Sequence, residues 1–352
     1  MKIIHIESGF GNQMLSYCEC LALKKMNPND KFYLETIIYD IPECNDIICQ
    51  WNGYELERIF GINTPPNIKT LFSANEWKAV ISDIRDTRFW EHNWNWPVYF
   101  EKVFNKNGLT VKNTRGDFTK EGRRVAFDVE RKKEWKDYIR GFDWYKWLKA
   151  KKDFALFSKK AQEIDNTEIH FRKTAENILD GQRLTFKQKG SGIERIEKEV
   201  RKAFTFPKIT DNKNQEAMEQ ILSENAVAIH ARRGDMLGYN YECYRFGYFK
   251  RCMKFIRSQV ADPVFYIFCD PGSVTWAKEN YKILGLDGKK DKIRFVDWNK
   301  GEDSYRDMQL MAACKHQVIT NSSFGWWGAW LNTFPGKITC SPDPRINTTH
   351  SF

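Results

Sequence analysis

The last third of the sequence alternates short apolar runs with longer helical patterns, and this alternation restricts the fold more than any other feature. Strands that alternate with helices of this length are typical of a parallel sheet with helices on both faces. Ligands of such sheets bind beyond the carboxyl ends of the strands. The predicted strands are 226–230, 264–269, 293–296, 317–320 and 337–340, and the predicted helices are 246–260, 274–284, 303–314 and 323–331.

The first thirty residues predict a second unit of the same kind. A strand at 2–7 is followed by a glycine-containing turn, a helical pattern that ends at Asn27-Pro28, and a further strand at 32–34. This is the β-loop-α-β start of a Rossmann-like sheet. Residues 40–205 mix helical patterns and turns without a clean period. The sequence therefore predicts two α/β domains with a cleft between them.

Composition excludes several classes of protein. The chain has 352 residues, of which 41% are hydrophobic and 15% aromatic, too many for an intrinsically disordered protein. No apolar run approaches the length of a membrane-spanning helix, and the start lacks the apolar region of a signal peptide, so a cytoplasmic location is expected. The nine cysteines include no C-x-x-C pair and are interpreted as reduced thiols, without the clustering of a zinc site.

The net charge of +10 favours anionic partners such as nucleotides, phosphates, nucleic acid or an anionic membrane face. Part of the excess is local, because residues 121–160 hold 13 Lys and Arg against 7 Asp and Glu. A solvated helical face explains this stretch, and a weak contact with a membrane surface is the alternative.

The residues that follow the strand at 226–230 predict a diphosphate site. The sequence there is His230-Ala-Arg-Arg-Gly-Asp235. Arg232 and Arg233 can each form a bidentate, charge-assisted pair with phosphate oxygens, and Asp235 can orient an Arg or accept a proton. A structural cluster of ion pairs is the alternative interpretation.

A second phosphate site is predicted where Asn321-Ser-Ser-Phe324 opens a helix, because hydroxyls and free N–H groups at a helix N-terminus bind anions. An ordinary N-cap with packed tryptophans is the alternative. Gly9-Phe-Gly11 is only a weak dinucleotide motif. No Asp-x-Asp pair occurs, which argues against a metal-diphosphate transferase and leaves Arg to neutralise a leaving group.

Two features of the middle of the chain carry further expectations. Large rings at every second position over Trp90–Trp96 predict a strand, and Trp94 and Trp96 could stack on a sugar or simply pack in the core. Phe204–Pro207 and the polar residues from Asp211 onward are interpreted as a linker.

Together these motifs resemble a known family. His230-x-Arg-Arg-Gly-Asp235, followed by Cys314-Lys-His-x-x-Ile-x-Asn-Ser-Ser-Phe-x-Trp-Trp-Gly-Ala-Trp-Leu-Asn332, is similar to the bacterial α-1,2-fucosyltransferases of glycosyltransferase family 11. The opening Gly9-Phe-Gly-Asn-Gln-Met14 resembles that family's Gly-Leu-Gly-Asn-Gln-Met. The resemblance covers about 226–333 and 1–30. The chain departs from the family pattern at Met236, where a Tyr is usual, at Cys269-Asp-Pro271, and at Gly325, where a Ser is usual.

The resemblance implies a GT-B-like α/β fold of two facing Rossmann-like domains with a cleft between them. Residues 1–205 would form an N-terminal acceptor-side domain with a long variable middle, and residues 206–352 a C-terminal domain that binds the GDP-sugar. It also implies transfer of L-fucose from GDP-β-L-fucose to the 2-hydroxyl of a terminal galactose, with inversion, no cofactor and no metal. By the same analogy the role would be capsule or O-antigen assembly, with a peripheral contact to the inner membrane or a lipid-linked glycan.

The resemblance also implies residue roles. Arg232 and Arg233 would hold the diphosphate and stabilise the leaving group, and His230 and Asp307 would approach the guanine. The implied donor-binding set is His230, Arg232, Arg233, Asp307, Asn321, Ser322, Ser323 and Phe324, with Gly11, Asn12 and Gln13 from the other domain.

Some alternatives stay open. Asp235 and Glu242 are both candidates for the general base, and a mechanism without a strong base is a third possibility. A transferase for another GDP-deoxysugar and a non-catalytic protein that binds phosphate or nucleic acid are the other functions considered. The fucosyltransferase interpretation itself predicts no nucleic-acid partner.

Overall fold

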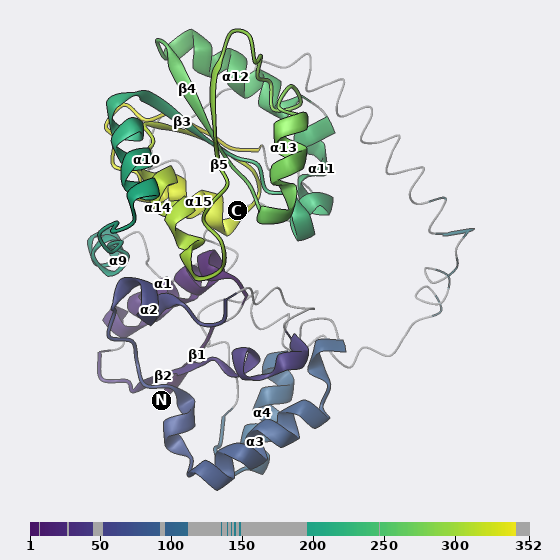
Figure 1. Cartoon of the computed structure of the whole chain (residues 1–352). Helices are drawn as coiled ribbons and strands as arrows, with labels where there is room; N and C mark the ends of the chain where they lie inside the picture. Colours follow the sequence, from purple (N-terminus) through teal and green to yellow (C-terminus); the bar gives the residue numbers. More distant parts are fainter. Residues whose placement is uncertain are drawn as a thin grey trace.

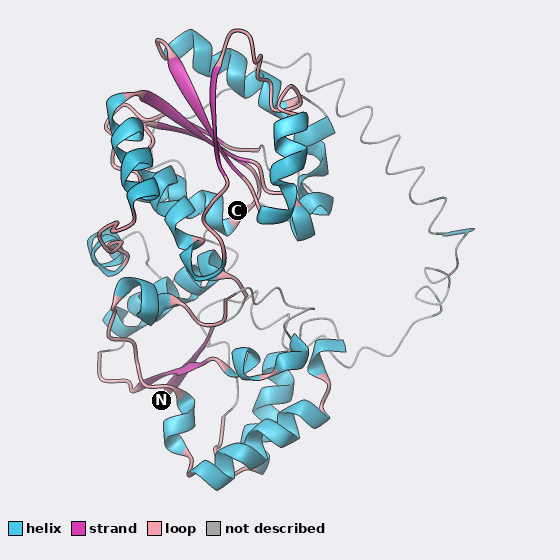
Figure 2. Cartoon of the chain, viewed as in Figure 1, coloured by secondary structure: helices cyan, strands magenta, loops and turns pink. Residues whose placement is uncertain are grey.

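The computed structural model shows a mixed α/β protein with two parallel sheets (Figure 1). Helices cover the strands of the larger sheet on both sides (Figure 2). The structure describes residues 1–6, 8–26, 28–44, 52–91, 96–111, 196–245 and 247–342, and the single residues 135, 139, 142, 144, 145 and 148.

The first sheet has two parallel strands, β1 (Lys2–His5) and β2 (Phe32–Glu35), joined by helix α1 (Phe10–Met26). This confirms the predicted β-loop-α-β start. The elements that follow are η1 (Ile37–Asp40), η2 (Pro42–Cys44), α2 (Leu56–Phe60), η3 (Ile68–Leu71), α3 (Ala74–Asp86), η4 (Phe89–Glu91) and α4 (Trp96–Lys106). Helix α3 begins with a capping box between Ser73 and Glu76.

The second sheet has five parallel strands in the order β5-β4-β3-β6-β7. They are β3 (Asn225–His230), β4 (Pro263–Phe268), β5 (Lys292–Val296), β6 (His316–Ile319) and β7 (Thr339–Cys340). Counted along the chain, this is the 3-2-1-4-5 order of a doubly wound sheet, whose order reverses between β3 and β6. All five predicted strands are confirmed.

Strands β3 and β4 of the larger sheet are buried on both faces, which explains why they are nearly continuous apolar runs, whereas the edge strand β5 alternates exposed Lys292 and Arg294 with Ile293 and Phe295. Val227 and Ile229 of β3 pack under α11 (Leu237–Arg245), α12 (Tyr248–Gln259) and α13 (Val274–Glu279). Ala226 and Ala228 face α10 (Asn212–Ser223) and α14 (Tyr305–Ala313) instead. Successive side chains of a strand point to opposite faces, so one strand contributes to two cores. Three short elements, η8 (Gly234–Met236), η9 (Pro271–Ser273) and η10 (Gly301–Asp303), lie in the connecting loops.

The two sheets are joined by one apolar core between α1, α9 (Glu197–Ala203) and α15 (Ser323–Leu331). Phe204 lies at its centre, with its ring centroid 5.0 Å from that of Phe60 and 5.2 Å from that of Trp327. The seam between α1 and α15 is therefore a packed interface, and it fixes how the site residues of the two sheets face each other (Figure 1).

Three predictions about secondary structure were wrong. The strand expected over Trp90–Trp96 is absent at its two described ends, because Trp90 lies in 3-10 turn η4 and Trp96 begins helix α4, where Pro97 suits a first turn and Phe100, Val103 and Phe104 form a buried face. Residues 92–95 lie outside the described residues. The expected linker after Asp211 is helix α10, which Asp211 caps. The helix expected to reach residue 284 ends at Glu279.

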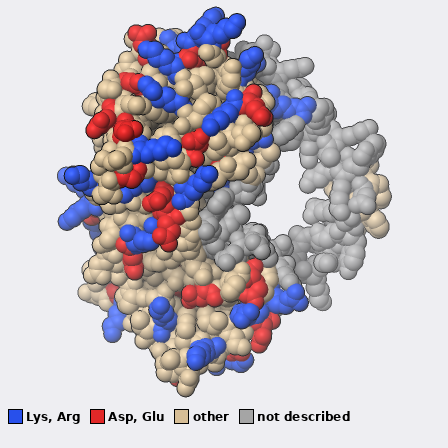
Figure 3. Space-filling view, viewed as in Figure 1, with Lys and Arg blue, Asp and Glu red and all other residues tan. Residues whose placement is uncertain are grey.

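Other expectations concern the surface and the thiols. In the described part of the chain no helix is both long and apolar enough to cross a membrane. Eight of the cysteines are described, and all eight are free thiols. Basic and acidic side chains are interspersed on the face shown in Figure 3. Nearly all of the basic stretch 121–160 lies outside the described residues.

Candidate functional site

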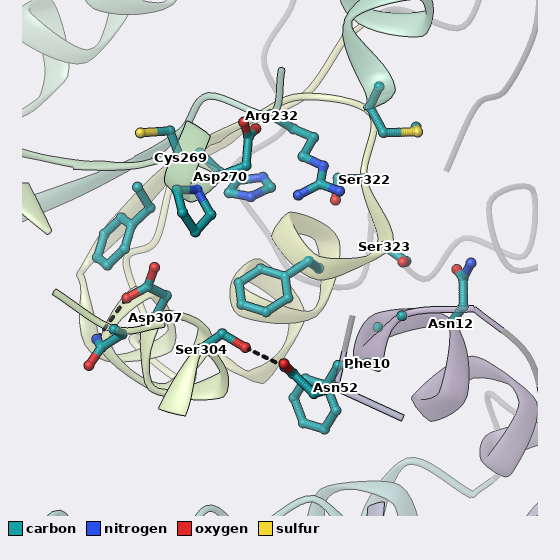
Figure 4. Close-up of a pocket in the computed structure, with 18 of the residues that line it drawn as sticks. Phe10, Asn12, Asn52, Arg232, Cys269, Asp270, Ser304, Asp307, Ser322 and Ser323 are labelled. Atoms are coloured by element: carbon teal, nitrogen blue, oxygen red, sulfur yellow. Dashed lines mark hydrogen bonds between the residues drawn. The ribbon is translucent and has the colours of Figure 1, made fainter. Parts of the chain in front are cut away.

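A cavity of about 210 Å³ opens between the two sheets, at the point where the strand order of the larger sheet reverses. Ligands of doubly wound sheets bind at this position. Figure 4 shows Arg232 pointing toward Ser322, with Phe10 and Asn12 on the opposite wall. The lining residues are Ser8, Gly9, Phe10, Gly11, Asn12, Asn52, Glu55, His230, Arg232, Met236, Phe268, Cys269, Asp270, Pro271, Asn299, Gly301, Ser304, Asp307, Ser322, Ser323 and Phe324.

The N-termini of α1 and α15 meet at this cavity. A β-carbon on Gly11 would lie 2.7 Å from both the backbone nitrogen of Phe324 and Oγ of Ser323, so only glycine allows this approach. Ser322 occupies the N-cap position of α15 but its side chain makes no capping hydrogen bond, and it lines the cavity instead. Two helix N-termini that face one space make that space favourable for an anion.

The loop after β3 is held by Asp270, at the end of β4. One carboxylate oxygen of Asp270 accepts the backbone N–H of Arg233 at 2.8 Å, and the other accepts the hydroxyl of Ser273. Gly234 has φ +37°, and a β-carbon there would lie 3.1 Å from the Asp270 carboxylate. The carbonyl of Arg232 also accepts the Tyr244 hydroxyl at 2.8 Å. These contacts fix the backbone that presents the Arg232 side chain to the cavity.

The two arginines of the motif lie in different environments. Arg232 lines the cavity, whereas the guanidinium of Arg233 stacks on Trp276, 3.5 Å from the ring centroid, and lies 5.1 Å from that of Tyr244. Arg233 therefore does not line the cavity. That both arginines hold a diphosphate stays a prediction; the structure places Arg232 in the cavity wall and Arg233 against Trp276.

His230 is buried at the end of β3, where its ring stacks on Phe324 with the centroids 5.7 Å apart. Burial, and to a smaller extent the neighbouring Arg232, lowers its pKa to about 3, so the ring is neutral at physiological pH. Its Nδ1 has no hydrogen-bond partner among the described residues. This atom lies against Gly325 of α15, so the ring packs on the start of that helix.

Asp307 lies in the first turn of α14 and forms another part of the wall. Its Oδ1 accepts a hydrogen bond of 2.7 Å from Nδ2 of Asn299. Burial raises the pKa of Asp307 to about 7, the Asn299 hydrogen bond opposes this shift, and Asp297 adds to it. The carboxyl group thus titrates in the physiological range.

Two other predicted residues fix the backbone near the cavity through buried hydrogen bonds. Gln13 is fully buried; its Nε2 donates to the carbonyls of Ser8 and Gly53, and its Oε1 accepts the backbone N–H of Glu55. Asn321 is held on Asn240 of α11 through its backbone N–H and carbonyl. The expectation that Gln13 reaches into the cleft is not what the structure shows, because both ends of its amide are used in fixing the loop that lines the cavity.

Several predicted side chains lie outside the described part of the chain. Asp235 is the middle residue of η8 and Glu242 lies in α11, but the positions of their side chains are not described. Trp94 lies wholly outside the described residues, and of Trp96 only the backbone, at the start of α4, is described.

Sequence reasoning missed Asn52, Glu55, Asn299 and Ser304. Asn52 Nδ2 donates to the carbonyl of Gly301 at 2.9 Å and to Oγ of Ser304 at 3.1 Å, and so joins the two halves across the cavity. Asn299 follows the end of β5, so the rule that ligands bind at strand ends could have identified it. Asn52 lies in a stretch without a recognisable pattern, and no sequence signal pointed to it.

No cluster of three or more His, Cys, Asp or Glu side chains suited to a metal ion occurs among the residues with described positions. The polar groups of the cavity are one guanidinium, one imidazole, one thiol, hydroxyls, amides and carboxylates. Metal independence stays a prediction.

This fold and site define a class: α/β proteins with an anion-favouring cavity at the switch point of a doubly wound parallel sheet. Residues 194–341, less than half of the chain, match the model of glycosyl transferase family 11. The match confirms the resemblance seen in the motifs.

Three curated relatives are informative. An α-1,2-colitosyltransferase of Escherichia coli is 32% identical over 136 residues, which cover 37% of this chain and 44% of the relative. The O-antigen biosynthesis glycosyltransferase WbnK of Escherichia coli is 32% identical over 131 residues, covering 35% and 41%. Galactoside α-(1,2)-fucosyltransferase 1 of Saimiri sciureus is 27% identical over 110 residues, covering 30% and 28%. The chain thus spans less than half the length of these relatives. No solved structure matches it.

Proposed function

We propose that this chain is a glycosyltransferase that moves L-fucose from GDP-β-L-fucose to the 2-hydroxyl of a terminal galactose. Transfer is inverting, forms an α1,2 linkage and uses neither metal nor cofactor. The observation that carries the proposal is the cavity in which Arg232 and the N-termini of α1 and α15 converge. The family 11 domain over 194–341 supports it. The proposal includes a GT-B-like arrangement of facing domains, 1–205 and 206–352.

The electrostatics of the cavity suit the departure of GDP. As the bond between C1 of fucose and the β-phosphate oxygen breaks, negative charge grows on that oxygen. A helix N-terminus carries roughly half a positive charge, and two of them here lie beside Arg232. Groups directed at developing charge stabilise the transition state more than the bound donor, so they accelerate the reaction as well as binding GDP.

The acceptor step needs an oxygen nucleophile on the opposite face of the sugar ring. The 2-hydroxyl oxygen of galactose forms a bond to C1 while the C1–phosphate bond breaks, and the hydroxyl proton passes to a base. Asp235 and Glu242 are the proposed bases, with late proton loss and no strong base as the alternative. Trp94 and Trp96 are the proposed acceptor-binding residues.

A second candidate donor is GDP-colitose. The observation that favours it is the relative named an α-1,2-colitosyltransferase. Colitose is fucose without the 3-hydroxyl group, so the GDP half of the site would be the same for both donors. The difference would lie in contacts with the sugar.

The test is GDP release by the purified chain with EDTA present, from GDP-fucose and from GDP-colitose, across a panel of terminal galactosides that includes a lipid-linked one. Release that requires both one donor and one galactoside supports the proposal and identifies the two substrates. Absence of release, with binding to nucleic acid that weakens steeply with salt, would support a non-catalytic binding protein instead. Release that occurs only with metal would contradict the metal-independent mechanism.

A further inference from the structure

A chain of buried hydrogen bonds leads from the start of α10 to Asp307 in the cavity wall. Asp211 accepts both the backbone N–H and the side-chain Nδ2 of Asn214, at 2.8 Å and 3.1 Å. Nδ2 of Asn214 also donates to Oδ1 of Asn299 at 2.8 Å, and Nδ2 of Asn299 donates to Oδ1 of Asp307 at 2.7 Å. Asn214 and Asn299 are 3% and 7% exposed. These hydrogen bonds are therefore shielded from water up to the cavity.

The direction of this chain is fixed at its far end. The indole Nε1 of Trp298 donates to Oδ1 of Asn214 at 2.9 Å, and an indole N–H can only donate. The second terminal atom of the Asn214 side chain must therefore be the nitrogen Nδ2. Its two N–H groups donate to the Asp211 carboxylate and to Oδ1 of Asn299. The Asn299 amide is oriented in turn, so that its NH₂ group faces Asp307.

This orientation determines what Asp307 offers a ligand. Burial raises the pKa of Asp307 to about 7, and the hydrogen bond that Asn299 donates to Oδ1 opposes this shift by stabilising the ionised form, which accepts hydrogen bonds without donating one. Guanine presents two adjacent donors, N1–H and the 2-amino group, on one edge. Adenine presents an acceptor, N1, in the corresponding place. A carboxylate held in this way pairs with guanine. Opposite adenine, the carboxylate oxygen and N1 would be two acceptors facing each other.

We propose that Asn299 and Asn214 are positioning residues that hold Asp307 as a fixed acceptor for guanine and make the chain select guanine over adenine nucleotides. This inference rests on the proposed function, because it assumes that the cavity binds the nucleotide of a GDP-sugar. It assigns the base selectivity to Asn299, which lines the cavity beside Asp307, and to Asn214, which lies behind Asn299 and outside the cavity lining.

The surroundings argue against a purely structural role. The two amides lie beside an apolar core between α10, α14 and the sheet, formed among others by Ile221, Leu310 and Met311. Apolar side chains would fill such a place without the desolvation cost of buried amides. The polar chain instead ends at a carboxylate that lines the cavity.

The experiment measures binding of GDP, IDP and ADP to the whole chain by calorimetry, for the wild type and three variants. Asn299→Leu removes the donor to Asp307. Trp298→Phe removes the indole N–H together with the five-membered ring and keeps a six-membered ring beside Lys213 and the helix. Gln309→Leu is the matched control, because Gln309 also lies on α14 and donates to the carbonyl of Pro207, outside the chain of amides.

We expect the wild type to bind GDP more tightly than IDP, which lacks the amino group, and ADP most weakly. Asn299→Leu should weaken GDP binding roughly 10- to 100-fold with little change for ADP, the size of a lost hydrogen bond to a charged group. Trp298→Phe should give a smaller loss of the same selectivity. Gln309→Leu should leave the order and the ratios unchanged.

The outcomes separate this inference from the proposed function. If the wild type binds no nucleoside diphosphate, the proposed function and this inference both fail. If it prefers GDP but Asn299→Leu and Trp298→Phe keep the full GDP-to-ADP ratio, only the inference is overturned. Should Asn299→Leu not fold, as judged by its circular dichroism, the ratio in Trp298→Phe decides.

Discussion

The indole N–H of Trp327 donates a hydrogen bond of 2.9 Å to the carbonyl oxygen of Gly11, which lies 316 residues earlier in the sequence. The bond joins the first turn of α1 to α15 and so connects the two sheets. The cavity lies at the open end of this seam, between residues 8–12 and Ser322 to Phe324. The site therefore depends on contact between the two halves as well as on the motifs within each.

Gly11→Ala should disrupt this seam. The added carbon would lie 2.7 Å from the backbone nitrogen of Phe324, and backbone cannot move aside as a flexible side chain can. Overpacking of this kind costs about 1–3 kcal/mol of unfolding free energy. Urea unfolding should show that loss, and GDP binding should weaken with it. The matched control is Gly272→Ala, since a β-carbon on Gly272 has no neighbour within 4 Å. Equal stability of the two variants would contradict the close approach.

Arg232→Ala and Arg233→Ala should differ, because only Arg232 lines the cavity. If Arg232 neutralises the leaving phosphate, its removal should lower kcat by roughly 10²- to 10³-fold, with the unfolding free energy nearly unchanged. Arg233→Ala should mainly lose the stacking on Trp276 and lower stability by about 1 kcal/mol. Steady-state kinetics and urea unfolding of both variants test this. A larger fall of kcat in Arg233→Ala than in Arg232→Ala would reverse the assignment.

The sequence allowed the larger sheet to be predicted but not every helix around it. The central strands β3 and β4 are buried on both faces and are nearly unbroken apolar runs, and the edge strand β5 has the alternating pattern of a strand with one exposed face. Helix α11 was missed because Leu237–Arg245 mixes Tyr, Asn and Glu with a glycine and has no apolar stripe. The alternating tryptophans of 90–96 have the spacing that is typical of a strand. The helix that starts at Trp96 is specified instead by residues further on, such as Phe100 and Phe104.

The candidate site was predictable only where its residues follow strands. His230, Arg232 and Ser322 could be found because the carboxyl ends of parallel strands meet at one edge. The sequence could not distinguish Arg232 from Arg233. Both lie in the loop after β3, where no regular pattern sets the direction of a side chain, and only the structure shows which one faces the cavity. Asn52 reaches the site through a tertiary contact with Ser304, and a local sequence pattern cannot predict such a contact.

GDP binding should depend on pH through Asp307. Burial raises the pKa of Asp307 to about 7, and pairing with guanine needs the ionised form. Below pH 7 a proton must be removed before GDP binds, so the apparent Kd should rise about tenfold per pH unit as pH falls, and level off above pH 7. Calorimetric titrations with GDP between pH 5.5 and pH 9 would measure this, with the pH range chosen as about 1.5 to 2 units on either side of that pKa.

The groups around Asp307 do not explain such a profile. The pKa of His230 is lowered to about 3 and that of Cys269 is raised to about 12, in both cases mainly by burial, so neither changes charge in this range. Asp297 pairs with Lys278, which lowers its pKa, and stays ionised. Asp307→Asn is the control and should bind GDP weakly. Any dependence of its Kd on pH comes from the phosphate of GDP or from Glu55, whose pKa is raised by burial. The same slope in both proteins would exclude Asp307 as the titrating group.

Gly325→Ala should reveal whether His230 must keep its place over the start of α15. A β-carbon at Gly325 would overlap Nδ1 of His230 and lie 3.0 Å from its Cγ, so the ring has to move or the helix must shift. We expect an unfolding free energy lower by about 1–3 kcal/mol and weaker nucleotide binding.

In a His230→Ala background the clash disappears, and Ala in place of Gly within a helix should then be neutral or stabilising by up to about 1 kcal/mol. The double-mutant cycle, measured by urea unfolding, should therefore show strong coupling between the two positions. Additive effects would mean that Gly325 is needed for some reason other than the position of His230.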